Sequence, residues 1–309
     1  MKQPRNQEEI DEYLDKIISK AERGIDKVFA ARLKEIKAMI GKLFEKYSNK
    51  EGELTPADVA KYNRLEKEMK LIKENLKNDY KAVMKAINKL METQYIENYM
   101  RSAYLYEMYT GKEMGFSAPS LEAIKQAAAN PIPQLTLPAI LERYRVELVN
   151  AISLQIAQGL LAGEGYAQIA KRVHGQMQLS LNKARLTART EAHRVQVFAR
   201  MKSAEHAAKH VKMEKMWSAA LDTRTRLGHR KLDGKIVPMN GLFKSIYGGI
   251  GKGPGHMHRA KDDCNCRCAI VYVVDGIKPD LRRARAGKGS KVIPYVTYAE
   301  WEKSHRKLS

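Results

Sequence analysis

Long apolar runs are absent from this 309-residue sequence, and none approaches the roughly 18 residues that a membrane-spanning helix needs. The chain turns acidic soon after Met1 and has no apolar segment of the kind that forms the core of a secretory signal. Cysteine is scarce as well, because three residues do not make the disulfide framework of a secreted domain. We therefore expect a protein without a membrane partner that works in a reducing compartment.

Acidic residues become few toward the end of the chain. From residue 171 onward, 30 Lys and Arg stand against 11 Asp and Glu, so 19 of the 21 excess positive charges lie there. A field of that sign attracts polyanions. Double-stranded DNA bound without sequence preference is one candidate partner, while an acidic protein and simple solubility remain alternatives. The candidate DNA-binding residues are Arg282, Arg283, Arg285 and Lys288.

Helical periodicity dominates the first third of the sequence. Apolar residues recur at steps of three and four through residues 8–48, and again from Pro56 to about Tyr109. A short break joins the two stretches, so they predict an antiparallel helical arm over residues 1–111. We expect the apolar stripes of this arm to contact another protein or a second copy of the chain.

Residues 112–210 continue as a helical segment. Ser120 is placed to cap a short helix, and residues 138–161 have a helical pattern. A short helix ending near Gly175 and another capped by Ser180 are expected to follow.

The pattern changes after residue 210. Residues 211–217 and 268–274 are short runs with strand character, and the glycines of residues 248–255 suggest a flexible loop. Residues 211–275 are therefore predicted to be a small α+β module, and residues 276–309 a basic tail. Within this tail, residues 276–291 suggest a linker, and residues 292–301 suggest a strand followed by one helical turn. The predicted fold class is mainly α, with a long antiparallel helical arm, a helical segment and a short-stranded C-terminal sheet.

A series of short motifs occupies the region between residues 188 and 268. In order they are Ala-Arg-Thr-Glu at 188–191, Lys-Met-Trp at 215–217, Asp-Thr-Arg-Thr-Arg at 222–226, His229, Leu-Asp-Gly-Lys at 232–235 and Asn-Cys-Arg-Cys at 265–268. This series resembles the phage Mu F-type minor head protein family over about residues 150–275. The resemblance implies a structural protein of a tailed phage or prophage, located in the virion head and assembled in the host bacterial cytoplasm. It also implies the portal protein, other head proteins and packaged DNA as partners.

The same resemblance favours a structural network over a catalytic site. Its predicted members are Arg189, Glu191, Trp217, Asp222, Arg226 and His229. Glu191 has a candidate partner three residues on, in Arg194, and a second one in the strand-rich module. A buried pair of this kind must be fully hydrogen-bonded, because burying charges is costly.

The alternative is a metal- or histidine-dependent nuclease or toxin domain. On a helical turn, Asp222, Arg226 and His229 would share one face. His229 would then act as a base, Asp222 would orient it and Arg226 would hold a phosphate. A metal-dependent nuclease should offer several converging carboxylates, and this region holds few, so we favour the non-enzymatic function.

Cys264, Cys266 and Cys268 alternate, so on a regular strand they would share one face with Cα atoms roughly 7 Å apart. If the chain bends, one pair could bind zinc, with His229, His256 and His258 available to complete a tetrahedral set. Cys266, Cys268 and His229 are the candidate ligands, because the family resemblance extends to these two cysteines. Half-buried thiols without a metal remain the other interpretation.

Overall fold

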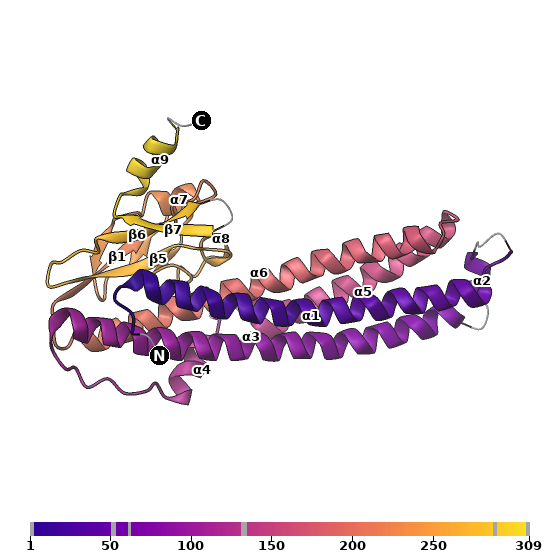
Figure 1. The fold of residues 1–309 in the computed structure, drawn as a ribbon, viewed down its shortest axis with the longest axis horizontal. Helices are drawn as coiled ribbons and strands as arrows, with labels where there is room; N and C mark the ends of the chain where they lie inside the picture. The colour runs from indigo at the N-terminus through magenta and orange to yellow at the C-terminus, as the bar shows by residue number, and fades with distance from the viewer. Residues whose placement is uncertain (1–2, 51–53, 61–62, 131–134, 287–288, 307–309) are drawn as a thin grey trace. The chain divides into compact units, whose positions relative to one another are not determined.

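The computed structural model describes residues 3–50, 54–60, 63–130, 135–286 and 289–306, whose fold is drawn in Figure 1. The chain divides into two compact units. One, here called the strand unit, draws on residues 1–18, 89–131 and 189–309; the other, here called the helical unit, draws on residues 19–88 and 132–188. Each unit is thus assembled from segments far apart in the sequence.

Four long helices supply the helical unit. The helices that contribute to it are α1 (Gln7–Tyr47), the short α2 (Pro56–Ala60), α3 (Arg64–Thr110), α5 (Leu137–Leu161) and α6 (Tyr166–Ala207). Parts of α1, α3, α5 and α6 lie side by side within this unit (Figure 1). Asn63 separates α2 from α3 with a left-handed backbone (φ 53°), which explains why the second predicted helix is interrupted near its start.

Polar contacts, one of them buried, join the helices of this unit. Arg32 of α1 donates two hydrogen bonds to Asp79 of α3, at 2.6 and 3.1 Å. The hydroxyls of Tyr80 on α3 and Ser180 on α6 are 2.5 Å apart. Ser180 therefore lies inside one continuous helix, and its predicted role as an N-cap is wrong. The helix end expected near Gly175 is absent as well, because α6 continues through this position.

The apolar stripes of the predicted arm are covered within the chain. Their buried members in the helical unit include Ile25, Ile36, Ile40, Leu76, Val83 and Ile87. Because α5 and α6 belong to the same unit, these side chains have partners without a second copy. The buried stripes thus stabilise the fold of one chain, and a protein partner has to use other side chains.

Short antiparallel strands characterise the strand unit. Its strands are β1 (Met213–Ser218), β2 (Ile236–Pro238), β3 (Phe243–Lys244), β4 (Ile250–Gly251), β5 (Ala269–Val274), β6 (Leu281–Ala286) and β7 (Gly289–Pro294). β1 is central in a sheet of order β2-β1-β5, while β3 pairs with β4 and β6 with β7. The helices α4 (Leu121–Ala128), α7 (Leu227–Arg230), α8 (Ala260–Asp263) and α9 (Tyr298–Arg306) also belong to this unit. The predicted fold class is confirmed.

The core of the strand unit forms around Trp217 of β1. Trp217 is fully buried and makes an edge-to-face contact with Phe243, with ring centroids 5.3 Å apart. The C-terminal part of α3 supplies Tyr106, whose ring packs edge-on against Tyr272 of β5. Burial of these large rings gives this unit an apolar core of its own.

The prediction of a flexible loop at residues 248–255 is wrong, and the basic tail has more regular structure than expected. The glycine-rich segment 248–255 is closely packed, since a Cβ on Gly251 would lie 1.7 Å from the carbonyl oxygen of His256. In the expected basic tail, the strand and helical turn predicted within residues 292–301 are present as parts of β7 and α9, but β6 lies where a linker was expected, and Trp301 of α9 is 5% exposed. The tail is structured because apolar residues between its basic ones, such as Ala284 and Tyr298, pack on the core of the strand unit. Among the described residues, no helix combines the length and apolarity that crossing a membrane requires.

Candidate functional site

A buried cluster of His229, Cys266, Cys268 and Asp262 lies in the strand unit. α7 carries His229, α8 carries Asp262, and the two cysteines lie in the segment between α8 and β5. The backbone bends there, with Asn265 in the left-handed region (φ 54°), so the cysteines are not on a regular strand. The bend brings both thiols to the same imidazole, which a straight strand would not do.

His229 contacts both thiols through one nitrogen and a carboxylate through the other. Its Nδ1 lies 3.4 Å from Sγ of Cys268 and 3.6 Å from Sγ of Cys266. Its Nε2 lies 3.2 Å from Oδ1 of Asp262, a residue with no exposed surface. The three side chains of His229, Cys266 and Cys268 are at most 5% exposed. The cluster is thus closed to bulk solvent.

The charges in this cluster depend on one another. Burial alone would lower the pKa of His229, but its hydrogen bond and charge interaction with Cys268, and its bond to Asp262, outweigh burial and raise the pKa. Burial would raise the pKa of Cys268, yet hydrogen bonds from Cys266 and His229 lower it. The pKa of Cys266 is raised, because this thiol donates to Cys268 and is itself buried.

The catalytic arrangement that the nuclease alternative required, with Asp222 orienting His229, is absent from the described residues. Residues 222–226 form a turn, and α7 begins only at Leu227, so Asp222 and His229 do not share a helical face. Asp262 occupies the position beside His229 that the nuclease alternative gave to Asp222. Sequence reasoning missed this role because Asp262 is 33 positions from His229. Its position just before the cysteines was the only available signal.

Asp222 is instead surrounded by arginines. It accepts hydrogen bonds from the backbone N–H and the guanidinium of Arg224, at 2.8 and 3.1 Å, and from Arg267 at 2.5 Å. Arg285 of β6 forms a longer ion pair at 3.7 Å. Burial would raise the pKa of Asp222, but these hydrogen bonds hold it well below the usual range.

Arg226 and Trp217 both contact the buried cluster. Arg226 donates to the backbone oxygens of Asp262, at 3.0 Å, and of Cys264, so it braces the bend that carries the cysteines. Trp217 packs edge-on against His229, with ring centroids 5.3 Å apart. Neither contact requires a bound substrate.

Glu191 forms a buried brace with Arg194. The Arg194 guanidinium, 4% exposed, donates to Glu191 at 2.7 and 3.1 Å and to the carbonyl oxygens of Ala127, Ala128 and Ala129. These carbonyls belong to the C-terminal end of α4, so the brace fixes that helix. The buried arginine is Arg194, whereas Arg189 is exposed.

The candidate DNA-binding residues have different environments. Arg282 is 3% exposed and donates to both carboxylate oxygens of Asp233, so its assignment as a DNA contact is wrong. Arg283 is partly buried and bonded to Asp15 at 2.6 Å. Arg285 is exposed. Lys288 lies outside the described residues.

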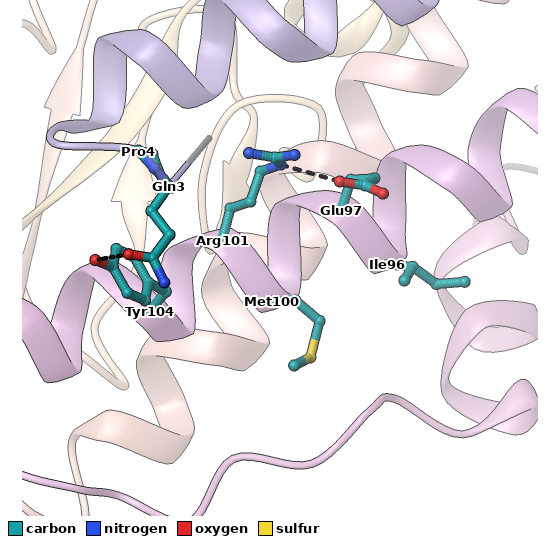
Figure 2. A pocket seen from close by; sticks show the side chains of 7 residues that line it. All are labelled: Gln3, Pro4, Ile96, Glu97, Met100, Arg101 and Tyr104. Carbon is teal, nitrogen blue, oxygen red and sulfur yellow. Dashed lines mark hydrogen bonds and ion pairs between the residues drawn. The ribbon is translucent and has the colours of Figure 1, made fainter. Parts of the chain in front are cut away.

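A surface hollow of about 280 Å³ is found elsewhere in the strand unit (Figure 2). Gln3, Pro4, Ile96, Glu97, Met100, Arg101 and Tyr104 line it. Figure 2 shows Arg101 bonded to Glu97 and Tyr104 bonded to Gln3. The lining includes none of the residues singled out from the sequence, and its charged side chains are already paired with each other.

Comparison with known proteins agrees with the motif series. The model of the family described as "Phage Mu protein F like protein" matches residues 150–271. Minor head protein GP7 of Bacillus phage SPP1 is 68% identical over 307 residues, which is 99% of each chain. This chain therefore belongs to the phage Mu F-like family of minor head proteins, as its motifs predicted.

A second relative has an enzymatic name. NAD(+)–arginine ADP-ribosyltransferase EFV of Enterococcus faecalis is 34% identical over 199 residues, which cover 63% of this chain and 40% of that protein. No solved structure matched this chain. The match along the whole chain is therefore to a minor head protein, and the match to the transferase is partial.

Proposed function

We propose that this protein is a structural component of a phage head that contacts the portal protein and binds packaged double-stranded DNA without sequence preference. The observation that carries the proposal is the 68% identity to a minor head protein over 99% of both chains. The proposed location is inside the virion head, after assembly in the host cytoplasm. The ADP-ribosyltransferase match covers too little of that enzyme to support an enzymatic function here.

The arginines around Asp222 support the DNA contact. Arg224, Arg267 and Arg285 approach one carboxylate, which leaves two positive charges uncompensated among these four groups. Their side chains are 62, 37 and 43% exposed, so their guanidinium groups are accessible to a phosphate. A guanidinium is well suited to a phosphate because its donors form a planar fork.

Binding to DNA is expected to fall steeply with salt and to be indifferent to sequence. In the full chain, Arg224→Gln combined with Arg285→Gln should reduce the slope of log affinity against log salt by about 2, because each arginine would neutralise one phosphate. Fluorescence anisotropy with two unrelated duplexes at several salt concentrations measures this.

The matched control removes the same charge from another place. Lys20→Gln combined with Lys27→Gln, both exposed on α1, should leave the slope unchanged. Equal slopes for the two double variants would contradict the assignment of the arginines. The DNA should be recovered intact with added Mg²⁺ or Zn²⁺, and cleavage would favour the nuclease alternative.

Portal contact is expected to use the exposed leucines of the helical unit. Leu154 and Leu161 lie seven residues apart on α5, and Leu179 and Leu186 do so on α6, with exposures of 43 to 75%. Changing all four to Gln should weaken co-purification of the full chain with the portal protein of the same phage by at least about tenfold, because each buried leucine contributes about 1.5–3 kcal/mol. Leu71→Gln, exposed on α3, is the control that should bind normally. A wild-type chain that does not co-purify would contradict portal contact.

A further inference from the structure

We propose that His229, Cys266 and Cys268 bind one structural zinc ion, with Asp262 orienting the imidazole. These side chains converge although they come from α7 and from the bend before β5. Their candidate ligand atoms, one nitrogen and two sulfurs, all lie within 4.8 Å of one another. The inference does not depend on the proposed contacts with portal or DNA.

The distances fit a tetrahedral zinc site. Zinc binds thiolate sulfur at about 2.3 Å and imidazole nitrogen at about 2.0–2.1 Å, which places a sulfur and a nitrogen ligand about 3.5 Å apart. The observed distances from Nδ1 of His229 to the two sulfurs are 3.4 and 3.6 Å. An ion would therefore need little movement of these three side chains.

Asp262 supplies the outer contact that zinc-binding histidines usually have. Its Oδ1 lies 3.2 Å from Nε2 of His229, so with zinc bound it would accept the Nε2–H while the Nδ1 lone pair binds the ion. Asp262 has no exposed surface, and its Oδ2 has no hydrogen-bond partner among the described residues. A metal-bound imidazole is a stronger donor than a free one, which would lower the cost of burying this carboxylate.

The backbone around the cysteines is braced from outside the cluster. Arg226 holds the carbonyl oxygens of Asp262 and Cys264, and the N–H of Cys266 donates to the backbone oxygen of Asp263 at 3.3 Å. These contacts hold the bend that turns both thiols toward His229. Cys264 lies in the same bend but does not belong to the cluster, so it provides a natural control.

Burial favours a structural role for the ion. His229, Cys266 and Cys268 are 2, 5 and 2% exposed. Three protein ligands leave one tetrahedral position for water or another donor, but this enclosed position gives a large substrate no access. Because the ligands come from separate elements, binding the ion would stabilise the fold of the strand unit.

Metal analysis of the purified full chain tests the proposal. We expect about one zinc per wild-type chain, and loss of that zinc in Cys266→Ser and in Cys268→Ser. Cys264→Ser should keep it. Replacing zinc by Co²⁺ in the wild type should produce the sulfur-to-cobalt charge-transfer absorption of thiolate ligands, a readout that needs no variant to fold.

A further variant and a chelator distinguish a zinc site from a cluster in which the thiols only form hydrogen bonds. Asp262→Asn should weaken metal affinity by about 10–100-fold while the cobalt absorption persists. A chelator that removes zinc from the wild type should lower its melting temperature. A wild-type chain that neither carries zinc nor develops the cobalt absorption would overturn the proposal, and so would equal zinc loss in Cys264→Ser.

Discussion

Asp233→Ala is expected to destabilise the strand unit by about 3–5 kcal/mol, because it leaves a buried guanidinium without its counter-charge. Asp233 accepts from Arg282 at 2.9 and 3.2 Å, and both side chains are 3% exposed. Asp233 also accepts the backbone N–H groups of Ala219 and Tyr298. One carboxylate thus joins the end of β1, the β6–β7 hairpin and the start of α9.

Tryptophan fluorescence during denaturant unfolding measures this effect in the strand unit alone. The chain has two tryptophans, and both Trp217 and Trp301 belong to that unit and are buried. Asp280→Ala is the matched control, since Asp280 is an exposed carboxylate next to the same hairpin, and its loss should change stability by at most about 0.5 kcal/mol. Equal unfolding midpoints for the two variants would refute the role of the Asp233–Arg282 pair.

Arg194→Ala is also expected to lower the free energy of unfolding by about 3–5 kcal/mol, because the ion pair with Glu191 is similarly buried. The substitution leaves the Glu191 carboxylate, 3% exposed, without its cation. It also removes the donors to three carbonyl oxygens at the end of α4. We therefore expect α4 to lose protection from hydrogen exchange before the rest of the strand unit does.

Two further variants test this brace. Arg194→Lys keeps the charge but not the planar fork, so it should lie between wild type and Arg194→Ala in stability. Lys209→Ala, an exposed cation just after α6, should unfold like the wild type. If Arg194→Ala unfolds at the same denaturant concentration as Lys209→Ala, the brace does not stabilise the unit.

Helix positions were largely predictable because helical periodicity is a local property. The first predicted helix, residues 8–48, corresponds to α1 at Gln7–Tyr47, and Ser120 caps α4 as expected by accepting from the N–H of Ala123. Local signals failed at Ser180, where a residue typical of caps is used inside a helix to bond a neighbouring helix. The residues around Ser180 in the sequence do not predict this tertiary hydrogen bond.

The residues of the buried cluster were predictable in part. His229, Cys266 and Cys268 were identified as a set from residue type and family resemblance, and the structure brings them together. Asp262 was not assigned to His229, because the choice between two carboxylates depends on where the chain turns. A helix through residues 222–229 would have favoured Asp222, whereas the turn that forms there directs Asp222 to the arginines.

The sequence by itself determined the family, the mainly helical class, the positions of β1 and β5 and the excess of positive charge after residue 170. Only the tertiary structure decided which charges are buried and which are exposed. Arg282 and Arg285 are three positions apart in one basic segment, yet the first is enclosed with Asp233 and the second is exposed beside Asp222. The physical reason is that the environment of a charge depends on partners distant in the sequence, which are in place only after the chain has folded.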